Sequence, residues 1–173
     1  DRFSAYGPSF RAVGDEGLSE EENARLYAEG AQGFLDVCAR EGINFAAVRT
    51  LEVGCGTGFY TRLLRDVGVK SYVGIDVTDV FFPHLRKEFP SFVFVRRDVT
   101  ADKIEGEFDL VVMMDVMEHV VSNSRLDFAM ANIRSCLASK GVFVVGPIMR
   151  GSYKRFFYLR FWSLNDLRSR FEG

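Results

Sequence analysis

A glycine-rich turn between an apolar run and a helical segment constrains the fold of this chain more than any other feature. The apolar pattern of residues 48–53 stops at three alternate glycines, Gly54, Gly56 and Gly58, and apolar side chains then recur at helical spacing from residue 60 to residue 67. This pattern predicts a strand, a tight turn and a helix. Glycine permits positive φ angles and lets a ligand approach the backbone. Free N–H groups and the positive end of the helix would face the space beyond the strand, so we expect a binding site there.

The alternation of strand and helix patterns continues along the chain. Strands are expected at residues 48–53, 71–76, 92–95, 108–113 and 142–145. Helices are expected at residues 20–41 after the N-cap Ser19, from the glycine turn to about 67, at 80–89, from 126 to a stop at Lys140-Gly141, and after the N-cap Ser163. This order predicts an α/β fold, a Rossmann-like doubly wound parallel sheet with helices on both faces.

One domain is expected at residues 19–173, since no repeat, low-complexity segment or linker interrupts the pattern. Residues 1–18 mix aromatic residues with Gly, Pro and Ser. We expect Phe3, Tyr6 and Phe10 to fold over the binding site as a lid, with simple core packing as the alternative.

Charge and composition exclude several classes of protein. The net charge of −2 gives the 173-residue chain no general attraction to nucleic acid or to an anionic membrane. No apolar stretch approaches the ~20 residues of a membrane-spanning helix, and no secretory signal is visible. The three cysteines, Cys38, Cys55 and Cys136, have a spacing that suits neither a zinc site nor a disulfide framework. We therefore expect reduced cysteines and a cytoplasmic protein.

Carboxylates stand at three consecutive strand ends, Asp76, Asp98 and Asp115. The carboxyl ends of parallel strands meet at one edge of the sheet, so these residues are expected to converge on one crevice, although a single Asp could equally be a helix cap or turn former. The spacing of Asp76 from the turn suits a carboxylate that binds a ribose diol. Two ligand classes fit, a dinucleotide and S-adenosylmethionine, but the third glycine of the dinucleotide fingerprint is replaced here by Phe59.

The chain closely resembles the class I S-adenosylmethionine-dependent methyltransferases, especially the small-molecule group that includes ubiquinone-biosynthesis-type enzymes. The motifs that carry the resemblance are Leu51-Glu52-Val53-Gly54-Cys55-Gly56-Thr57-Gly58, Val73-Gly74-Ile75-Asp76, Arg97-Asp98-Val99, Phe108-Asp109-Leu110-Val111-Val112, Asp115-Val116-Met117-Glu118-His119-Val120 and Gly141-Val142-Phe143-Val144-Val145. They cover roughly residues 20–170, in the order and at the spacing of the family.

The resemblance implies S-adenosylmethionine as cofactor, with S-adenosylhomocysteine as product. The glycine turn would pack on the methionine part, Asp76 would bind the ribose, Asp98 the adenine amine, and the backbone near Asp115 the ammonium group. The full set of implied cofactor-binding residues is Glu52, Gly54, Cys55, Gly56, Gly58, Tyr60, Asp76, Val77, Asp98, Val99, Met114 and Asp115.

Members of the family normally finish with an antiparallel hairpin on the sheet, and that C-terminal hairpin is apparently missing, because the chain stops at Gly173. The resemblance therefore implies a C-terminally incomplete domain, whose sheet edge a partner or a larger chain would complete.

His119 is the candidate general base, since imidazole titrates near pH ~6.5 and the residue follows the fourth strand. The alternative is a structural role at the start of a helix. A related metal-binding run places Glu and His at the positions of Asp115 and Val120, so no metal is expected. His84, on the second helix of the alternating pattern, is expected to be a surface residue.

The segment at residues 149–162 is expected to bind the methyl acceptor. It combines four basic residues and six aromatic ones with no acid, which suits an anionic or aromatic molecule, although a solvated loop with packed aromatics is an alternative. The candidate substrate residues are Tyr6, Arg150, Tyr153, Lys154 and Arg155. We expect methyl transfer to oxygen of a small or medium organic acceptor. An RNA or protein methyltransferase, or a catalytically silent S-adenosylmethionine-binding subunit, remains an alternative, and the net charge argues against nucleic acid.

Overall fold

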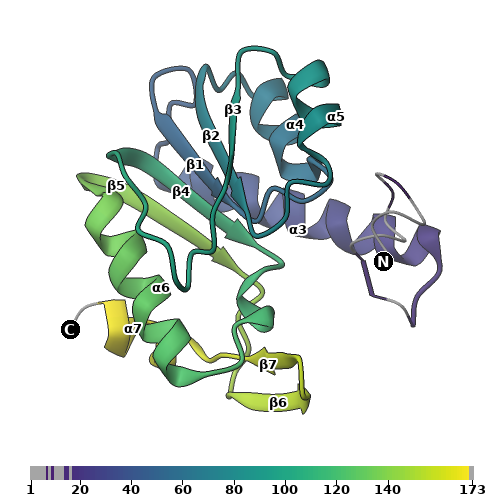
Figure 1. Ribbon diagram of the computed structural model, residues 1–173, viewed down its shortest axis with the longest axis vertical. Helices are drawn as coiled ribbons and strands as arrows, with labels where there is room; N and C mark the ends of the chain where they lie inside the picture. The colour runs from purple at the N-terminus through teal and green to yellow at the C-terminus, as the bar shows by residue number, and fades with distance from the viewer. Residues whose placement is uncertain (1–6, 8, 10–13, 16, 172–173) are drawn as a thin grey trace.

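Five parallel strands form the centre of the computed structural model, which describes residues 7, 9, 14, 15 and 17–171 (Figure 1). Their order across the sheet is β3-β2-β1-β4-β5. The strands are β1 (Arg49–Val53), β2 (Ser71–Asp76), β3 (Val93–Arg96), β4 (Phe108–Met114) and β5 (Leu137–Gly146). The strand order reverses direction between β1 and β4, which is where open α/β sheets bind ligands. The predicted Rossmann-like parallel sheet is confirmed.

Helices cover both faces of the sheet (Figure 1). On one face lie α3 (Glu20–Arg40), α4 (Phe59–Asp66) and α5 (Phe82–Glu88), which bury Phe34, Leu64 and Leu85 against the strands. On the other face lie α6 (Asn123–Cys136) and α7 (Leu164–Phe171), with Met130 and Trp162 in the core. The two hydrophobic layers are separate because successive strand residues point to opposite faces.

The first long helix begins where the sequence predicts. Ser19 and Glu22 form a capping box at the start of α3, with the Ser19 side chain accepting from the Glu22 N–H and the Glu22 carboxylate accepting from the Ser19 N–H. Gly42, which follows the C-cap of α3, has a φ of 66°. The predicted N-cap of the last helix is also confirmed, since the Asp166 N–H donates to Ser163 Oγ. Most of the predicted lid at residues 1–18 lies outside the described residues.

The helix predicted from residue 126 does not continue to Lys140-Gly141, so this prediction of its end is wrong. Helix α6 ends at Cys136, and Leu137 already has extended backbone angles and pairs with Phe108. The ladder between β4 and β5 then shifts register before Leu110, so residues 138–141 continue a strand of ten residues. Because the shift is a local irregularity with no apolar periodicity of its own, the sequence pattern gave no sign of it.

An antiparallel strand pair, β6 (Tyr153–Phe156) and β7 (Leu159–Phe161), forms a second, two-stranded sheet at residues that were expected to form a loop. This hairpin does not extend the large sheet, where β5 is the terminal strand on its side among the described residues. The hairpin packs against the short 3-10 helix η1 (Met117–His119), and the Trp162 indole N–H donates to the Val120 carbonyl over 2.9 Å. Among the described residues, no helix is both long enough and apolar enough to cross a membrane.

Candidate functional site

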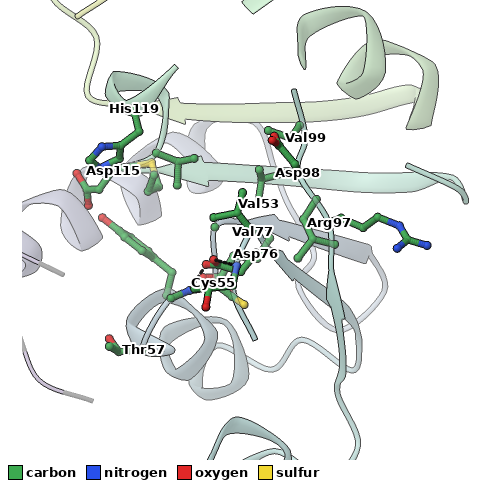
Figure 2. A pocket seen from close by; sticks show the side chains of 18 of the residues that line it. Val53, Cys55, Thr57, Asp76, Val77, Arg97, Asp98, Val99, Asp115 and His119 are labelled. Atoms are coloured by element: carbon green, nitrogen blue, oxygen red, sulfur yellow. Dashed lines mark hydrogen bonds between the residues drawn. The ribbon is translucent and has the colours of Figure 1, made fainter. Parts of the chain in front are cut away.

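A cavity of about 570 Å³ opens at the carboxyl ends of the strands (Figure 2). The turn after β1, the end of β2, the segment after β3 and the segment after β4 form its walls. Figure 2 shows Asp115 and His119 together at one end, Asp98 and Val99 at another, and Asp76 between them. The three carboxylates predicted to converge are thus brought to one cavity.

The glycine turn needs its glycines for conformation and for space. Gly54 and Gly56 have φ angles of 78° and 48°, which side-chain-bearing residues rarely adopt. A Cβ atom at Gly54 would lie 2.2 Å from a methyl group of Val116, so the segment after β4 approaches the turn closely. The Gly54 and Cys55 N–H groups both donate to the Ile75 carbonyl, at 2.7 Å and 3.2 Å, which fixes the turn against β2.

Asp76 lies at the end of β2 and contacts the turn directly. Its Oδ2 accepts from the Gly56 N–H over 2.9 Å, and its Oδ1 accepts from the Thr78 N–H over 3.0 Å. Burial raises the pKa of this carboxyl above its ordinary value, and the two backbone donors act in the opposite direction. Each oxygen keeps a lone pair for a ligand hydroxyl.

Asp98 and Val99 lie side by side on the segment after β3 (Figure 2). Oδ1 of Asp98 accepts from both the N–H and the hydroxyl of Thr100, at 2.8 Å and 2.6 Å. The carbonyl of Val99 accepts from the side-chain amide of Asn132 over 3.1 Å, so α6 holds this segment in place. The Asp98 carboxylate and the apolar Val99 side chain are therefore fixed next to each other on the cavity wall.

Asp115 and Tyr60 line the end of the cavity near β4, and Glu118 lies outside the cavity wall, three residues after Asp115. Burial raises the pKa of Asp115 to about 6, and burial together with the Asp115 charge raises the pKa of Glu118 to about 7. Burial and the charge of Asp115 also raise the pKa of Tyr60. Within the described part of the chain, the Tyr60 hydroxyl and Glu118 Oε2 are buried and have no hydrogen-bond partner. Such orphaned polar groups are costly unless a ligand or water satisfies them.

Glu52 is a residue of β1, and its side chain lies beneath the turn, where it contacts β2 and α4. One of its carboxylate oxygens, Oε2, accepts from the Thr61 hydroxyl over 2.9 Å and from the Tyr72 hydroxyl. Complete burial raises the pKa of Glu52 to about 8, although the two hydroxyl donors lower it. Near neutral pH this carboxyl therefore keeps its proton in a large fraction of molecules.

His119 ends η1 and lines the cavity at its rim. The residue is exposed, but the protein on its inner side desolvates the imidazole and lowers its pKa. The ring is therefore neutral at physiological pH, with one nitrogen available as a proton acceptor. His84 is exposed on α5 beside Glu88, as predicted.

Eleven of the implied cofactor residues line the cavity: Glu52, Gly54, Cys55, Gly56, Tyr60, Asp76, Val77, Asp98, Val99, Met114 and Asp115. Gly58 does not; with a φ of 85° it caps the start of α4 instead. The candidate substrate residues Arg150, Tyr153, Lys154 and Arg155 also lie outside the cavity wall, and Tyr6 lies outside the described residues. Arg155 approaches Asp15 at 3.9 Å.

Sequence reasoning missed part of the cavity wall. The additional lining residues include Tyr27, Thr57, Phe59, Thr78, Phe81, Arg97, Thr100, Val116 and Arg125. The motifs quoted for the resemblance contain Thr57, Arg97 and Val116. Their place in these motifs could therefore have predicted that they line the cavity. Nothing in the sequence marks Tyr27 or Arg125, because their roles depend on how α3 and α6 pack on the sheet. No group of three or more His, Cys, Asp or Glu residues in the described ranges could hold a metal ion.

The chain matches the family described as "Methyltransferase domain" over residues 51–145. Among individual relatives, it is 30% identical to a highly reducing polyketide synthase of Gibberella fujikuroi over 116 residues, which is 58% of this chain and 4% of the relative. It is 31% identical to a tRNA U34 carboxymethyltransferase of Pseudomonas syringae over 115 residues, 62% of this chain and 34% of the relative. It is 30% identical to a ubiquinone biosynthesis O-methyltransferase of Methylococcus capsulatus over 83 residues, 44% of this chain and 35% of the relative.

Two solved structures show the same fold. An S-adenosylmethionine-dependent methyltransferase from Clostridium acetobutylicum has a TM-score of 0.67 at 15% identity, covering 84% of this chain and 79% of that one. An O-methyltransferase of a polyketide synthase multienzyme from Brevibacillus brevis, solved with S-adenosyl-L-homocysteine, has a TM-score of 0.60 at 16% identity, covering 76% of this chain and 49% of that one.

The parallel sheet and the cavity at its strand ends agree with the methyltransferase class that the family match defines. The chain belongs to the methyltransferase-domain family, which its matched segment identifies over more than half its length. The resemblance drawn from the motifs is thereby confirmed at the level of the family. The chain spans about a third or less of the length of the curated relatives it matches.

The cavity fits the cofactor of this class. S-adenosylmethionine carries a sulfonium and an ammonium group, and the cavity wall offers the carboxylates of Asp76, Asp98 and Asp115. None of the three forms an ion pair with a described residue. The backbone of the glycine turn lines the cavity, and the unpartnered Tyr60 hydroxyl adds a hydrogen-bonding group to its wall.

Proposed function

We propose that the protein transfers a methyl group from S-adenosylmethionine to an oxygen atom of a small or medium organic acceptor in the cytoplasm. One observation carries the proposal: a single cavity combines a glycine turn, three carboxylates (Asp76, Asp98 and Asp115) that form no ion pair with any described residue and, at its rim, the desolvated imidazole of His119. The first two features suit the cationic cofactor, and the third suits a hydroxyl acceptor. The three cysteines are free and buried among the described residues, which supports a reducing compartment.

The residues that would hold the cofactor divide by position. Asp76 would accept hydrogen bonds from the ribose hydroxyls, while Asp98 and Val99 would bind the adenine ring through its amine and its face. Asp115 and the backbone at Met114 would receive the ammonium group, with the Tyr60 hydroxyl nearby. When bound, S-adenosylmethionine supplies an electrophilic methyl group on a positively charged sulfur. Holding donor and acceptor in line is the main contribution of the protein and can be worth about 7–11 kcal/mol.

His119 would act on the acceptor. Its neutral ring nitrogen can take the proton of the acceptor hydroxyl as the oxygen–carbon bond forms and the carbon–sulfur bond breaks. General-base assistance of this kind is worth roughly 10²–10⁴ in rate. The lowered pKa keeps the imidazole in the form that accepts a proton at neutral pH.

The hairpin beside the cavity supports an acceptor with aromatic character. Tyr153, Phe156, Phe157 and Tyr158 are exposed on the hairpin, and Phe157 keeps 83% of its surface accessible. The hairpin packs against η1, which carries His119. Aromatic residues exposed together usually form an interaction surface.

Calorimetric titration tests the cofactor half of the proposal. The wild-type protein should bind S-adenosylmethionine and S-adenosylhomocysteine, and Asp76→Ala should weaken both, while the exposed control Asp66→Ala should leave both unchanged. Absence of binding by the wild-type protein would contradict the proposed function.

A screen with isotopically labelled methyl donor tests the acceptor half. Pools of phenols, hydroxy acids and amines are compared with unmodified transfer RNA and with protein, because relatives named as tRNA U34 carboxymethyltransferases match this chain. Label in the hydroxyl-bearing small molecules is the expected result. Label in RNA or protein would replace the proposed acceptor. Tight cofactor binding without any transfer would favour a silent cofactor-binding subunit.

A further inference from the structure

We propose that Arg125 binds an anionic oxygen group, a carboxylate or a phosphate, on the methyl acceptor. This inference rests on the proposed function and adds a charge requirement to its substrate. Arg125 stands in the first turn of α6, directly after the segment that carries His119, and it lines the cavity. Its own backbone N–H donates to the N-cap Ser122, which fixes the start of the helix.

The guanidinium group of Arg125 has no partner among the described residues. Several other arginines of the structure are engaged, for example Arg62 with Glu88 at 2.7 Å, Arg49 with Asp109 at 2.8 Å, and Arg170 with Asp127 at 2.7 Å. Arg97, which also lines the cavity, donates to a backbone carbonyl. Arg125 is exposed, and its side chain forms no such bond with any residue that the structure describes.

The free cation is notable because carboxylates line the same cavity. Glu52, Asp76, Asp98 and Asp115 all contribute to the wall, yet none pairs with Arg125. Arg125 therefore does not serve to neutralise them. An arginine stays charged at every physiological pH, and its planar fork matches the two oxygens of a carboxylate or phosphate.

The surroundings of Arg125 favour the acceptor over the cofactor as its ligand. Val120 lines the cavity between His119 and Arg125, and its carbonyl accepts from Trp162 at the base of the hairpin. Residues 147–165 next to this rim contain four basic residues and no Asp or Glu. The hairpin that packs against η1 therefore adds positive charge on the side of the cavity that carries His119, whereas Asp76, Asp98 and Asp115 make the inner wall acidic.

The geometry assigns a defined chemistry to the acceptor. It carries a hydroxyl group and, at a distance, an anionic oxygen group. Arg125 would hold the anion, and His119 would take the hydroxyl proton as the oxygen accepts the methyl group from the donor, whose sulfur would keep the electron pair of the broken carbon–sulfur bond. A neutral analogue of the same acceptor keeps the reacting hydroxyl but cannot form the ion pair with Arg125.

The test compares matched acceptors and matched variants. Methyl transfer is measured for 3,4-dihydroxybenzoate, its neutral amide, and the corresponding phosphate-bearing catechol, with wild-type protein, Arg125→Ala, Arg125→Lys and the control Arg168→Ala, an exposed arginine of α7. We expect turnover of at least one anionic member, a KM that Arg125→Ala raises about 10- to 100-fold with a smaller change in kcat, and partial recovery in Arg125→Lys. The KM and kcat for the neutral amide should be the same in Arg125→Ala and Arg125→Lys as in the wild-type protein.

A second measurement decides the proposal without turnover. Phenylglyoxal modifies free arginines, and mass spectrometry reads its extent at Arg125 and at Arg168, with and without S-adenosylhomocysteine. The anionic compounds should protect Arg125 and not Arg168, and the amide should protect neither. Absence of protection by every anion, or equal protection by the amide, would overturn the proposal.

Cofactor binding separates this inference from the proposed function. Arg125→Ala should bind S-adenosylhomocysteine as wild type does. A loss of cofactor affinity in Arg125→Ala alone would assign the guanidinium to the carboxylate of the cofactor and overturn the proposal. Absence of cofactor binding in the wild-type protein would instead contradict the proposed function, while the protection measurement would still report on Arg125.

Discussion

The Gly56 N–H donates to Asp76 Oδ2 over 2.9 Å and so joins the turn after β1 to the end of β2. The same carboxylate accepts from the Thr78 N–H, which means that one side chain orders the backbone on two sides of the cavity. Asp76 therefore orders the turn, and under the proposed function it also binds the cofactor above the turn. Substitutions at this residue should change stability and cofactor affinity together.

Asp76→Ala should lower the affinity for S-adenosylmethionine by about 10- to 100-fold, since it removes a charged acceptor. It should also lower the free energy of unfolding by about 1–3 kcal/mol, because the Gly56 and Thr78 N–H groups lose their partner. Calorimetry and urea unfolding measure the two effects. Asp76→Asn keeps one acceptor oxygen and should lie between wild type and Asp76→Ala. An unchanged affinity in Asp76→Ala would remove Asp76 from the cofactor site.

Gly54→Ala should destabilise the fold by about 1–3 kcal/mol, because the new methyl group would meet Val116 and the φ of 78° would be strained. Gly33→Ala is the matched control, since that glycine lies within α3 with open space around it and its replacement should stabilise the helix by up to about 1 kcal/mol. Thermal or urea unfolding of both variants gives the comparison. Equal stability of the two would show that the turn tolerates a side chain.

Asp115 should make cofactor binding depend on pH. Burial raises its pKa from 3.8 to about 6, so the carboxylate is charged above that pH and becomes protonated below it. Affinity for S-adenosylmethionine should therefore fall as the pH drops from 7 to 5. Asp115→Asn should bind more weakly at pH 7 and lose most of this dependence, and Asn suits the φ of 56° at this position. Calorimetry across this range measures both proteins, and the same pH profile in both would contradict the assignment.

Glu52→Gln should change how stability depends on pH. The pKa of Glu52 is 4.5 in the unfolded reference and about 8 in the fold, so the folded state holds an extra proton between these values. Stability contributed by this proton is present at low pH and is lost as the pH rises through about 8, by at most about 1.4 kcal/mol per pH unit. Urea unfolding at pH 5, 7 and 9 should show a smaller slope for Glu52→Gln. The exposed control Glu105→Gln should keep the wild-type slope.

His119→Ala should reduce kcat by about 10²–10⁴ for a hydroxyl acceptor while leaving cofactor affinity unchanged. His84→Ala, which alters an exposed imidazole on α5, serves as the control. Single-turnover rates with labelled donor give the measurement. Unchanged turnover in His119→Ala would favour the structural role and leave the reaction to positioning alone.

The features that sequence predicts correctly are those that depend on neighbours along the chain. The glycine turn needs no distant residue to be recognised, and the capping box at Ser19 and Glu22 is a local signal. Asp76, Asp98 and Asp115 follow from the rule that parallel strands end at one edge. The fold class, the position of the cavity and many of the residues that line it were therefore predictable.

The features that sequence misses depend on contacts between distant segments. The register shift between β4 and β5 decides where α6 ends, and no periodicity marks it. The expected loop at 149–162 forms a hairpin because β7 packs on η1 and Trp162 reaches Val120. In the sequence, Arg125 cannot be distinguished from other charged residues on helix surfaces. Only the packing of α6 beside the cavity shows that it lines the wall. The residues expected to bind the acceptor were chosen from the composition of the segment at 149–162. Composition does not show which side chains point toward the cavity.

The hydrogen bond from Trp162 to Val120 has a consequence for how proteins of this kind can diversify. It attaches the C-terminal hairpin of β6 and β7 to the rim of the cavity, whereas the glycine turn that lines the same cavity comes much earlier in the chain. Under the proposed function, mutations that reshape the hairpin would change the methyl acceptor and leave the residues around the methyl donor intact. A lineage could then exchange one acceptor for another through substitutions in β6 and β7, provided that Trp162 is retained.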